Sequence, residues 1–178
     1  RRMRLQFSQA LPVGAASMGE YFDIFLTEEV DPEETLTRLV ASSPSLLAPL
    51  KAAHVPYALP ALEAWLTRST WSVNVLDETD VSALARAIDA VRTRGSITYM
   101  RGEKEKHVDL TKTLVSFEER PSGTGYLLDC RSCEEGSLRP AILISEAARQ
   151  AGIPMPAIAV CRVGQWHEDE DGSLVEPM

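Results

Sequence analysis

The stretch from Arg1 to Val30, RRMRLQFSQALPVGAASMGEYFDIFLTEEV, is the most informative part of the chain for predicting its fold. Met3 to Phe7 alternates apolar and polar side chains, which predicts a half-buried strand. Tyr21 to Leu26, YFDIFL, is rich in aromatic and β-branched residues and predicts the partner strand, joined by a Gly-containing loop. Because the first strand starts almost at residue 1, with nothing before it to cover it, we expect the chain to lack its N-terminal element.

A helix and a third strand are expected to follow this pair of strands. Asp31 can cap a helix that Pro32 opens, and Glu34 adds the third position of a capping box. That helix is expected to end near Pro44. The segment from Leu46 to Val55 is then expected to form a strand.

Beyond a short connecting segment, the sequence alternates between strand and helix patterns. The acidic tail, HEDEDGSLVEPM, is expected to be mobile. The expected elements before it are a strand at Trp71–Leu76, a helix from Val81 to Gly95, a strand at Ile97–Met100, a hairpin of Leu114–Glu118 and Tyr126–Cys130, a helix from Pro140 to Gly152, and a strand at Ala157–Val163.

These patterns predict an α+β protein built from two ferredoxin-like halves, each with the order βαββαβ. Residues 1–56 form the first half, which lacks its opening β-α. Residues 57–69 connect it to the second half at 70–166, and residues 167–178 form the acidic tail. A ferredoxin-like sheet has two helices on one face, so a half without one helix leaves apolar side chains exposed unless another segment covers them.

Composition narrows the classes of partner and location. The 178 residues carry a net charge of −8, which argues against a broad electrostatic contact with nucleic acid, although a local basic patch stays possible. No apolar run approaches the roughly 18 residues needed to span a bilayer, so we expect no membrane partner. Three cysteines and no visible signal peptide suit a reducing, cytoplasmic location.

The segment LPVGAASMGEYFDI, Leu11 to Ile24, resembles the signature of the radical-SAM-linked domain of unknown function, a bacterial domain encoded beside or fused to a radical SAM protein. Weaker matches lie at His107–Leu110, Leu138–Pro140 and Arg162. The resemblance implies a radical SAM protein as partner, and the loss of an opening strand and helix that carry a Ser-His-Leu-Asp motif. The signature residues are Pro12, Val13, Gly14, Ser17, Glu20, Tyr21 and Asp23.

The loop between the first two strands is a candidate binding site formed by Gly14, Ser17, Glu20 and Asp23. Carboxylates in such a loop can hold a ligand or act in catalysis, and Asp23 is a candidate catalytic residue. Turn capping and hairpin pairing explain the same residues equally well. Both interpretations stay open on the sequence.

Three cysteines are candidates for redox or metal chemistry. Cys130 and Cys133 form a C-x-x-C, with Cys161 as a third thiol, and this spacing lets two sulfurs converge in one turn. However, no histidine stands at a recognisable spacing to complete a zinc site, and the three-cysteine spacing of iron–sulfur chemistry is absent. We therefore expect small buried hydrophobic side chains here, and neither a metal nor another cofactor.

The densest basic run, RGEKEKHVDL at 101–110, also contains Asp109, a second candidate catalytic carboxylate. Its cations suit RNA phosphates or an acidic partner, but two glutamates dilute them, and a charged edge strand is the alternative. Arg139 precedes a helix N-terminus and Arg162 lies on the last strand. In a ferredoxin-like order these two arginines can approach each other to bind a phosphate or carboxylate, although ordinary ion pairs explain them too.

Three functions fit these observations. The first is an accessory or binding domain that assists a radical SAM enzyme, in the modification of RNA or of a ribosome-associated component. The second is an RNA-modifying enzyme in its own right that uses Asp23 or Asp109. The third is a structural interaction module without chemistry, since the common hydrolase, nucleotide-binding and zinc-protease signatures do not occur.

Overall fold

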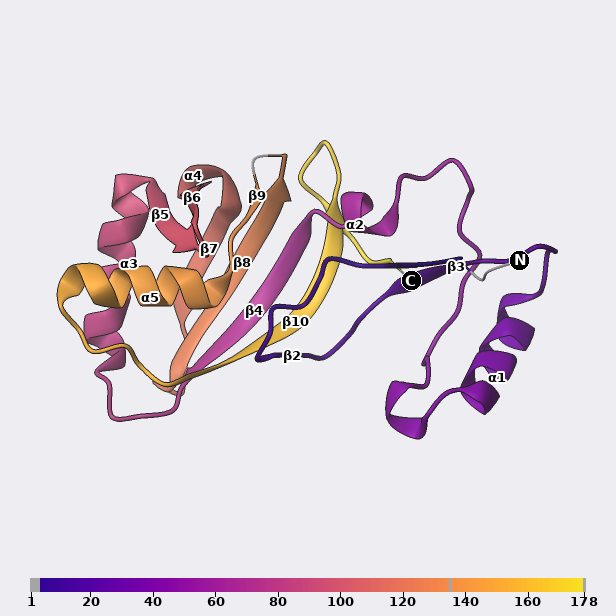
Figure 1. The fold of residues 1–178 in the computed structure, drawn as a ribbon, viewed down its shortest axis with the longest axis horizontal. Coiled ribbons are helices and arrows are strands. Elements are labelled where there is room, and N and C mark those ends of the chain that lie inside the picture. The colour runs from indigo at the N-terminus through magenta and orange to yellow at the C-terminus, as the bar shows by residue number, and fades with distance from the viewer. Residues whose placement is uncertain (1–3, 135, 178) are drawn as a thin grey trace.

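The computed structural model describes residues 4–134 and 136–177. Figure 1 shows a larger part, in which a twisted sheet is backed by α3 and α5, and a smaller part that contains β1, β3 and α1. Helices and strands share the same chain, so the predicted α+β class is confirmed. Among the described residues, no helix is long and apolar enough to cross a membrane.

The main sheet has the strand order β11-β10-β4-β8-β7, with all of these neighbours antiparallel. β2 runs parallel to β10 along its outer side, and β9 extends β8. Its strands are β2 (Ala15–Ser17), β4 (Arg68–Val75), β7 (Leu114–Glu119), β8 (Gly125–Cys133), β9 (Gly136–Ser137), β10 (Ile158–Glu168) and β11 (Leu174–Val175).

Two helices, α3 (Val81–Arg94) and α5 (Pro140–Ala151), pack against each other and cover one face of this sheet (Figure 1). Alternate residues of β4, such as Trp71 and Val73, are buried beneath them. The Asp80 carboxylate accepts from the Ala83 N–H at 3.0 Å and so begins α3. Gly95 ends it with a φ of +81°, a conformation that favours glycine.

Between α3 and β7 the chain forms a separate hairpin. Its strands are β5 (Ser96–Arg101) and β6 (Lys104–Asp109), and a single turn of helix, α4 (Leu110–Thr113), returns the chain to the main sheet. Ile97 and Val108 face each other at the base of the hairpin and are buried, which anchors it to the core.

The N-terminal region, residues 4–61, has a different character. β1 (Arg4–Phe7) and β3 (Phe22–Phe25) form a two-stranded antiparallel sheet, followed by α1 (Pro32–Ser42). Asp31 accepts from the Glu33 and Glu34 N–H groups, as the sequence predicted. No apolar side chain described in this region is buried, whereas the core region, residues 62–168, starts with the buried Leu62 of α2 (Leu62–Trp65).

Two predicted elements are wrong. The strand expected at Leu46–Val55 is replaced by the 3₁₀ turn η1 (Ser45–Leu47) and irregular chain, because Pro44 and Pro49 lack backbone donors and no neighbouring strand pairs there. The tail is ordered, since Leu174 and Val175 pair with the end of β10 around a turn at Gly172. Met3 of the first predicted strand and Met178 lie outside the described residues.

Candidate functional site

An open cleft of about 600 Å³ lies on the helix-covered face of the main sheet, beyond the N-terminal end of α5. Its floor consists of inward-facing side chains of β4, β8 and β10. Its walls come from α2, β9, the start of α5 and the chain after β1. The lining residues used below are Gln9, Glu63, Trp71, Cys130, Ser132, Glu134, Ser137, Arg139 and Arg162.

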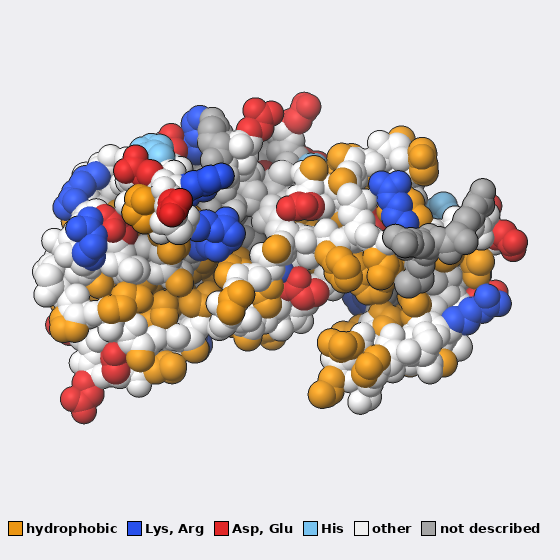
Figure 2. All heavy atoms as spheres, viewed as in Figure 1, with side chains coloured by type: hydrophobic (Ala, Val, Ile, Leu, Met, Phe, Trp, Pro, Cys, Tyr) orange, Lys and Arg blue, Asp and Glu red, His pale blue; other side chains and the backbone are white. Residues whose placement is uncertain are grey.

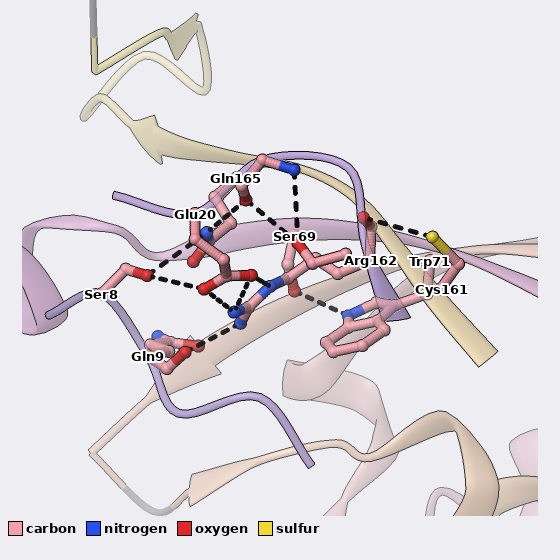
Figure 3. A network of polar contacts seen from close by, with 10 residues as sticks. Ser8, Gln9, Glu20, Ser69, Trp71, Cys161, Arg162 and Gln165 are labelled. Atoms are coloured by element: carbon pink, nitrogen blue, oxygen red, sulfur yellow. Dashed lines mark hydrogen bonds and ion pairs between the residues drawn. The ribbon is translucent and has the colours of Figure 1, made fainter. Parts of the chain in front are cut away.

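Arg162 on β10 is the central charge of this site, and its side chain is only 1% exposed. Its Nη2 donates to both carboxylate oxygens of Glu20 at 2.6 Å, and its Nε donates to one of them at 3.2 Å (Figure 3). Its Nη1 donates to the backbone carbonyl of Gln9 at 3.0 Å. The guanidinium lies 5.4 Å from the centre of the Trp71 ring. One buried cation therefore joins β10 to the chain before β3.

Polar neighbours hold this ion pair in place. Gln165 is buried on β10, three residues after Arg162. Its side chain donates to the Ser8 hydroxyl at 3.4 Å and to the Gly19 carbonyl at 3.3 Å. The Ser8 hydroxyl in turn donates to Glu20 at 3.3 Å. Figure 3 shows these side chains converging from opposite ends of the sequence. The network fixes residues 8–20 over the sheet, and this segment forms one wall of the cleft.

Gln9 bridges the wall and the floor of the cleft. Its amide nitrogen donates to the Leu66 carbonyl at 2.8 Å, and its amide oxygen accepts from the Ser132 hydroxyl at 3.0 Å. Gln9 and Ser132 belong to no sequence motif, so neither was predicted as a site residue. Trp71 was expected in a strand but not in the site, although its position in the alternating pattern places it on the inward face.

Arg139 lies at the rim, at the N-cap position of α5, where no side chain caps the helix. The structure thus places Arg139 and Arg162 on the lining of the same cleft. Among the described lining residues, Glu63 and Glu134 add two carboxylates to these two cations. Together with the apolar side chains of the lining, such as Trp71, these charges suit a ligand that combines polar and apolar groups.

The loop residues predicted as a binding site lie behind the cleft wall. Gly14 stands in a turn with a φ of +85°, and Ser17 on β2 pairs in register with Arg162. The Ser17 hydroxyl contacts the backbone of Gly19 at 3.1 Å. Of the four predicted residues, Glu20 alone touches a residue of the cleft lining through its side chain, namely Arg162.

The two candidate catalytic carboxylates lie elsewhere. Asp23 on β3 pairs opposite Gln6, and partial burial raises the pKa of its carboxyl group. Asp109 accepts hydrogen bonds from the Thr111 hydroxyl and N–H and so caps α4; these bonds lower its pKa. Neither residue lines the cleft.

The C-x-x-C lies on a strand, where residues three apart point to opposite faces. Cys130 is buried, and burial raises the pKa of its thiol to about 12, which makes it a poor nucleophile at neutral pH. Cys161 lies on β10, which β4 separates from β8, and its Sγ contacts the Arg162 carbonyl at 3.7 Å. Within the described residues, no group of three His, Cys, Asp or Glu side chains is arranged to hold a metal ion.

The face of the main sheet opposite α3 and α5 carries a paired charge network. Arg68 donates to Asp129 and to Glu168, the latter at 2.7 Å, and Arg131 donates to Glu168 at 2.5 and 2.6 Å. Arg131 first, and then Arg68, lowers the pKa of the Glu168 carboxyl group. Because Arg68 and Arg131 already have carboxylate partners, neither of these two cations is free to bind an RNA phosphate.

Comparisons with known proteins give one match. A family model described as an uncharacterised protein conserved in bacteria, DUF2344, matches residues 1–140. No curated protein and no solved structure matches the chain.

Proposed function

Because the chain belongs to DUF2344, a family of uncharacterised proteins conserved in bacteria, we propose a function from its cleft: it is a binding domain that presents a substrate to a partner enzyme. The observation that carries the proposal is the cleft of about 600 Å³ with the buried Arg162 on its floor. This volume lies within the range of small-molecule pockets. Glu20 holds the buried Arg162 side chain in one orientation, so this part of the floor has a fixed shape.

The partner in this proposal is a radical SAM protein, which the resemblance of Leu11–Ile24 implies, and the substrate is RNA or a ribosome-associated component. The exposed apolar side chains of the N-terminal region support a contact with another protein, because large exposed apolar patches usually mark such contacts. Figure 2 shows hydrophobic side chains gathered on this smaller part. They include Leu46, Leu47 and Leu50.

We also interpret residues 70–166 as ferredoxin-like. The support is the sheet order β10-β4-β8-β7, with α3 following β4 and α5 following β8 on one face, and with the β5–β6 hairpin inserted. For residues 1–56 the support is limited to the order β1-β3-α1, since β1 and β3 pair only with each other.

Co-purification and product analysis test the partner. The tagged full chain is expected to co-purify with the radical SAM protein encoded beside it, and deletion of the chain is expected to lower the yield of that enzyme's product. Leu46→Glu should weaken the association, because it places a charge in the exposed apolar surface. Leu76→Glu is the control, because Leu76 is also exposed, at 66%, but lies in the core region. Unchanged product after deletion, without any association, contradicts the proposal.

Blocking the cleft tests its role separately. Ser137 is exposed at the cleft, so Ser137→Trp fills the space with little effect on folding. We expect this variant to bind the partner but to give less modified product, whereas Ser82→Trp on the exposed side of α3 changes neither. Normal product with Ser137→Trp would show that the cleft does not serve the reaction.

A further inference from the structure

Pairing between β5 and β6 sorts the charges of their hairpin onto opposite faces. Residues directly opposite each other in an antiparallel pair share a face, and the faces alternate along each strand. Arg101 is opposite Lys104 and Tyr99 is opposite Lys106, so these four side chains share one face. Glu105 lies on the other. The mixed run of basic and acidic residues in the sequence thus becomes a cationic face in the structure.

The cations of this face are open to solvent. Arg101, Lys104 and Lys106 are exposed, while Tyr99 is half-buried against the core. Among the residues that the structure describes, no carboxylate forms an ion pair with any of the three cations. This contrasts with Arg68, whose charge is fully paired. The hairpin therefore retains a local positive surface in a chain of net charge −8.

The cationic face lies close to the element that forms the cleft rim. β5 contacts α5, and the N-terminal end of α5 carries Arg139 at the cleft. Figure 1 shows β5 ending above α5, and Figure 2 shows Lys and Arg side chains gathered on this side of the larger part. The positive end of the α5 dipole adds to the attraction for anions.

We propose that this face of the β5–β6 hairpin docks the phosphate backbone of single-stranded RNA and leads it toward the cleft. Cations at alternate strand positions lie about 7 Å apart, which suits a chain of regularly spaced anions. Tyr99 lies opposite Lys106 and two residues before Arg101 on the same face, and an aromatic ring beside cations provides a surface on which a base can stack. An acidic peptide would use the cations but not the ring. The inference rests on the proposed function, because it locates the surface for the RNA substrate named there.

Fluorescence anisotropy with a labelled single-stranded RNA of about 12 nucleotides tests this docking surface. The full chain is titrated at a series of salt concentrations. We expect the triple variant Arg101→Gln, Lys104→Gln, Lys106→Gln to bind roughly tenfold more weakly at low salt. The slope of log affinity against log salt should also fall by about 2, since each phosphate contact contributes about 0.7.

Two controls separate local from general effects. The control variant removes three exposed cations outside the hairpin through Lys51→Gln, Arg86→Gln and Arg92→Gln. Its affinity for the RNA should stay within about twofold of that of the parent chain. Tyr99→Leu should weaken binding with little change in the salt slope, because stacking is not ionic. Equal losses from the two triple variants, or no loss from either, overturn the inference.

An acidic protein on this surface would give a different result from RNA, and failure of the RNA inference can be told apart from failure of the proposed function. If polyglutamate displaces the RNA as well as unlabelled RNA does, and Tyr99→Leu binds normally, the surface serves an acidic protein and the RNA inference fails. If the parent chain does not bind RNA, the inference also fails. In both cases the co-purification and Ser137→Trp tests still decide the proposed function.

Discussion

The N-terminal region and the core region use their apolar side chains in opposite ways. In the core region, the faces of β4, β8, α3 and α5 close around a continuous buried cluster. In the N-terminal region, side chains such as Leu46, 95% exposed, and Tyr57, 96% exposed, face solvent. The two-stranded sheet β1-β3 and the helix α1 leave every described apolar side chain of residues 4–61 at least partly exposed, so they do not enclose a core. The difference shows that apolar content alone does not give burial.

The largest difference between the regions should appear on removing apolar side chains. Leu128 on β8 is fully buried, so Leu128→Ala should lower the free energy of unfolding by about 2–5 kcal/mol. Leu46→Ala should change it by less than about 0.5 kcal/mol. Urea unfolding monitored by tryptophan fluorescence measures both values. A large loss from Leu46→Ala would reveal a contact that buries this side chain.

The next largest effect should come from the ion pair that joins the two regions. Arg162→Met removes the donor that binds Glu20 and Gln9, and we expect a loss of about 1–3 kcal/mol, because the partner Glu20 is 45% exposed and can regain water. Hydrogen exchange should accelerate in residues 8–20 but not in β8. Arg38→Met, which breaks an exposed pair with Glu34, is the control and should cost less than about 0.5 kcal/mol.

Two helix caps provide a matched comparison at about 1 kcal/mol. Asp31 caps α1 and Asp80 caps α3 through the same kind of carboxylate–amide bond. Asp80→Ala should lower global stability by about 1 kcal/mol, because α3 is part of the core. Asp31→Ala should instead loosen α1 alone, seen as faster hydrogen exchange with unchanged urea unfolding. Equal effects on global unfolding would show that the two regions unfold together.

The smallest effect concerns pH, and its sign should differ between the regions. The pKa of Glu168 is lowered mainly by Arg131, so its stabilising contribution is present above the ordinary value of 4.5 and is lost as the pH falls below it. The pKa of Asp23 is raised by burial, so its ionisation opposes folding and stability falls as the pH rises through 3.8. Glu168→Gln should flatten the acid side of the stability curve, and Asp23→Asn should remove the opposite trend.

The sequence predicted the elements whose signals are local. Asp31 marked a helix start, and Gly95 marked a helix end, because caps depend on residues only a few positions away. The strand expected at Leu46–Val55 failed for the opposite reason. An apolar stretch specifies a strand only when a partner strand lies beside it, and partners are set by the whole fold.

Of the candidate site, the sequence could indicate only those residues that have a local signal. Arg139 and Arg162 were recognisable from their places at a helix start and on the last strand, and both line the cleft. The pairing of Arg162 with Glu20, and the bridge through Gln9, join residues more than 140 positions apart. No local pattern encodes such contacts. The C-x-x-C was ambiguous because its geometry depends on whether the backbone forms a turn or a strand.

The parallel pairing of β2 with β10 has a consequence for the order in which the chain folds. Ala15 pairs with Val160, so β2 has no partner until the residues up to β10 have been synthesised. At typical translation rates this delay lasts roughly 7–30 s. During that interval β2 stays unpaired, with its apolar neighbours exposed. A chaperone that acts on nascent chains would therefore meet β2 before its partner strand exists and release it only after β10 has formed.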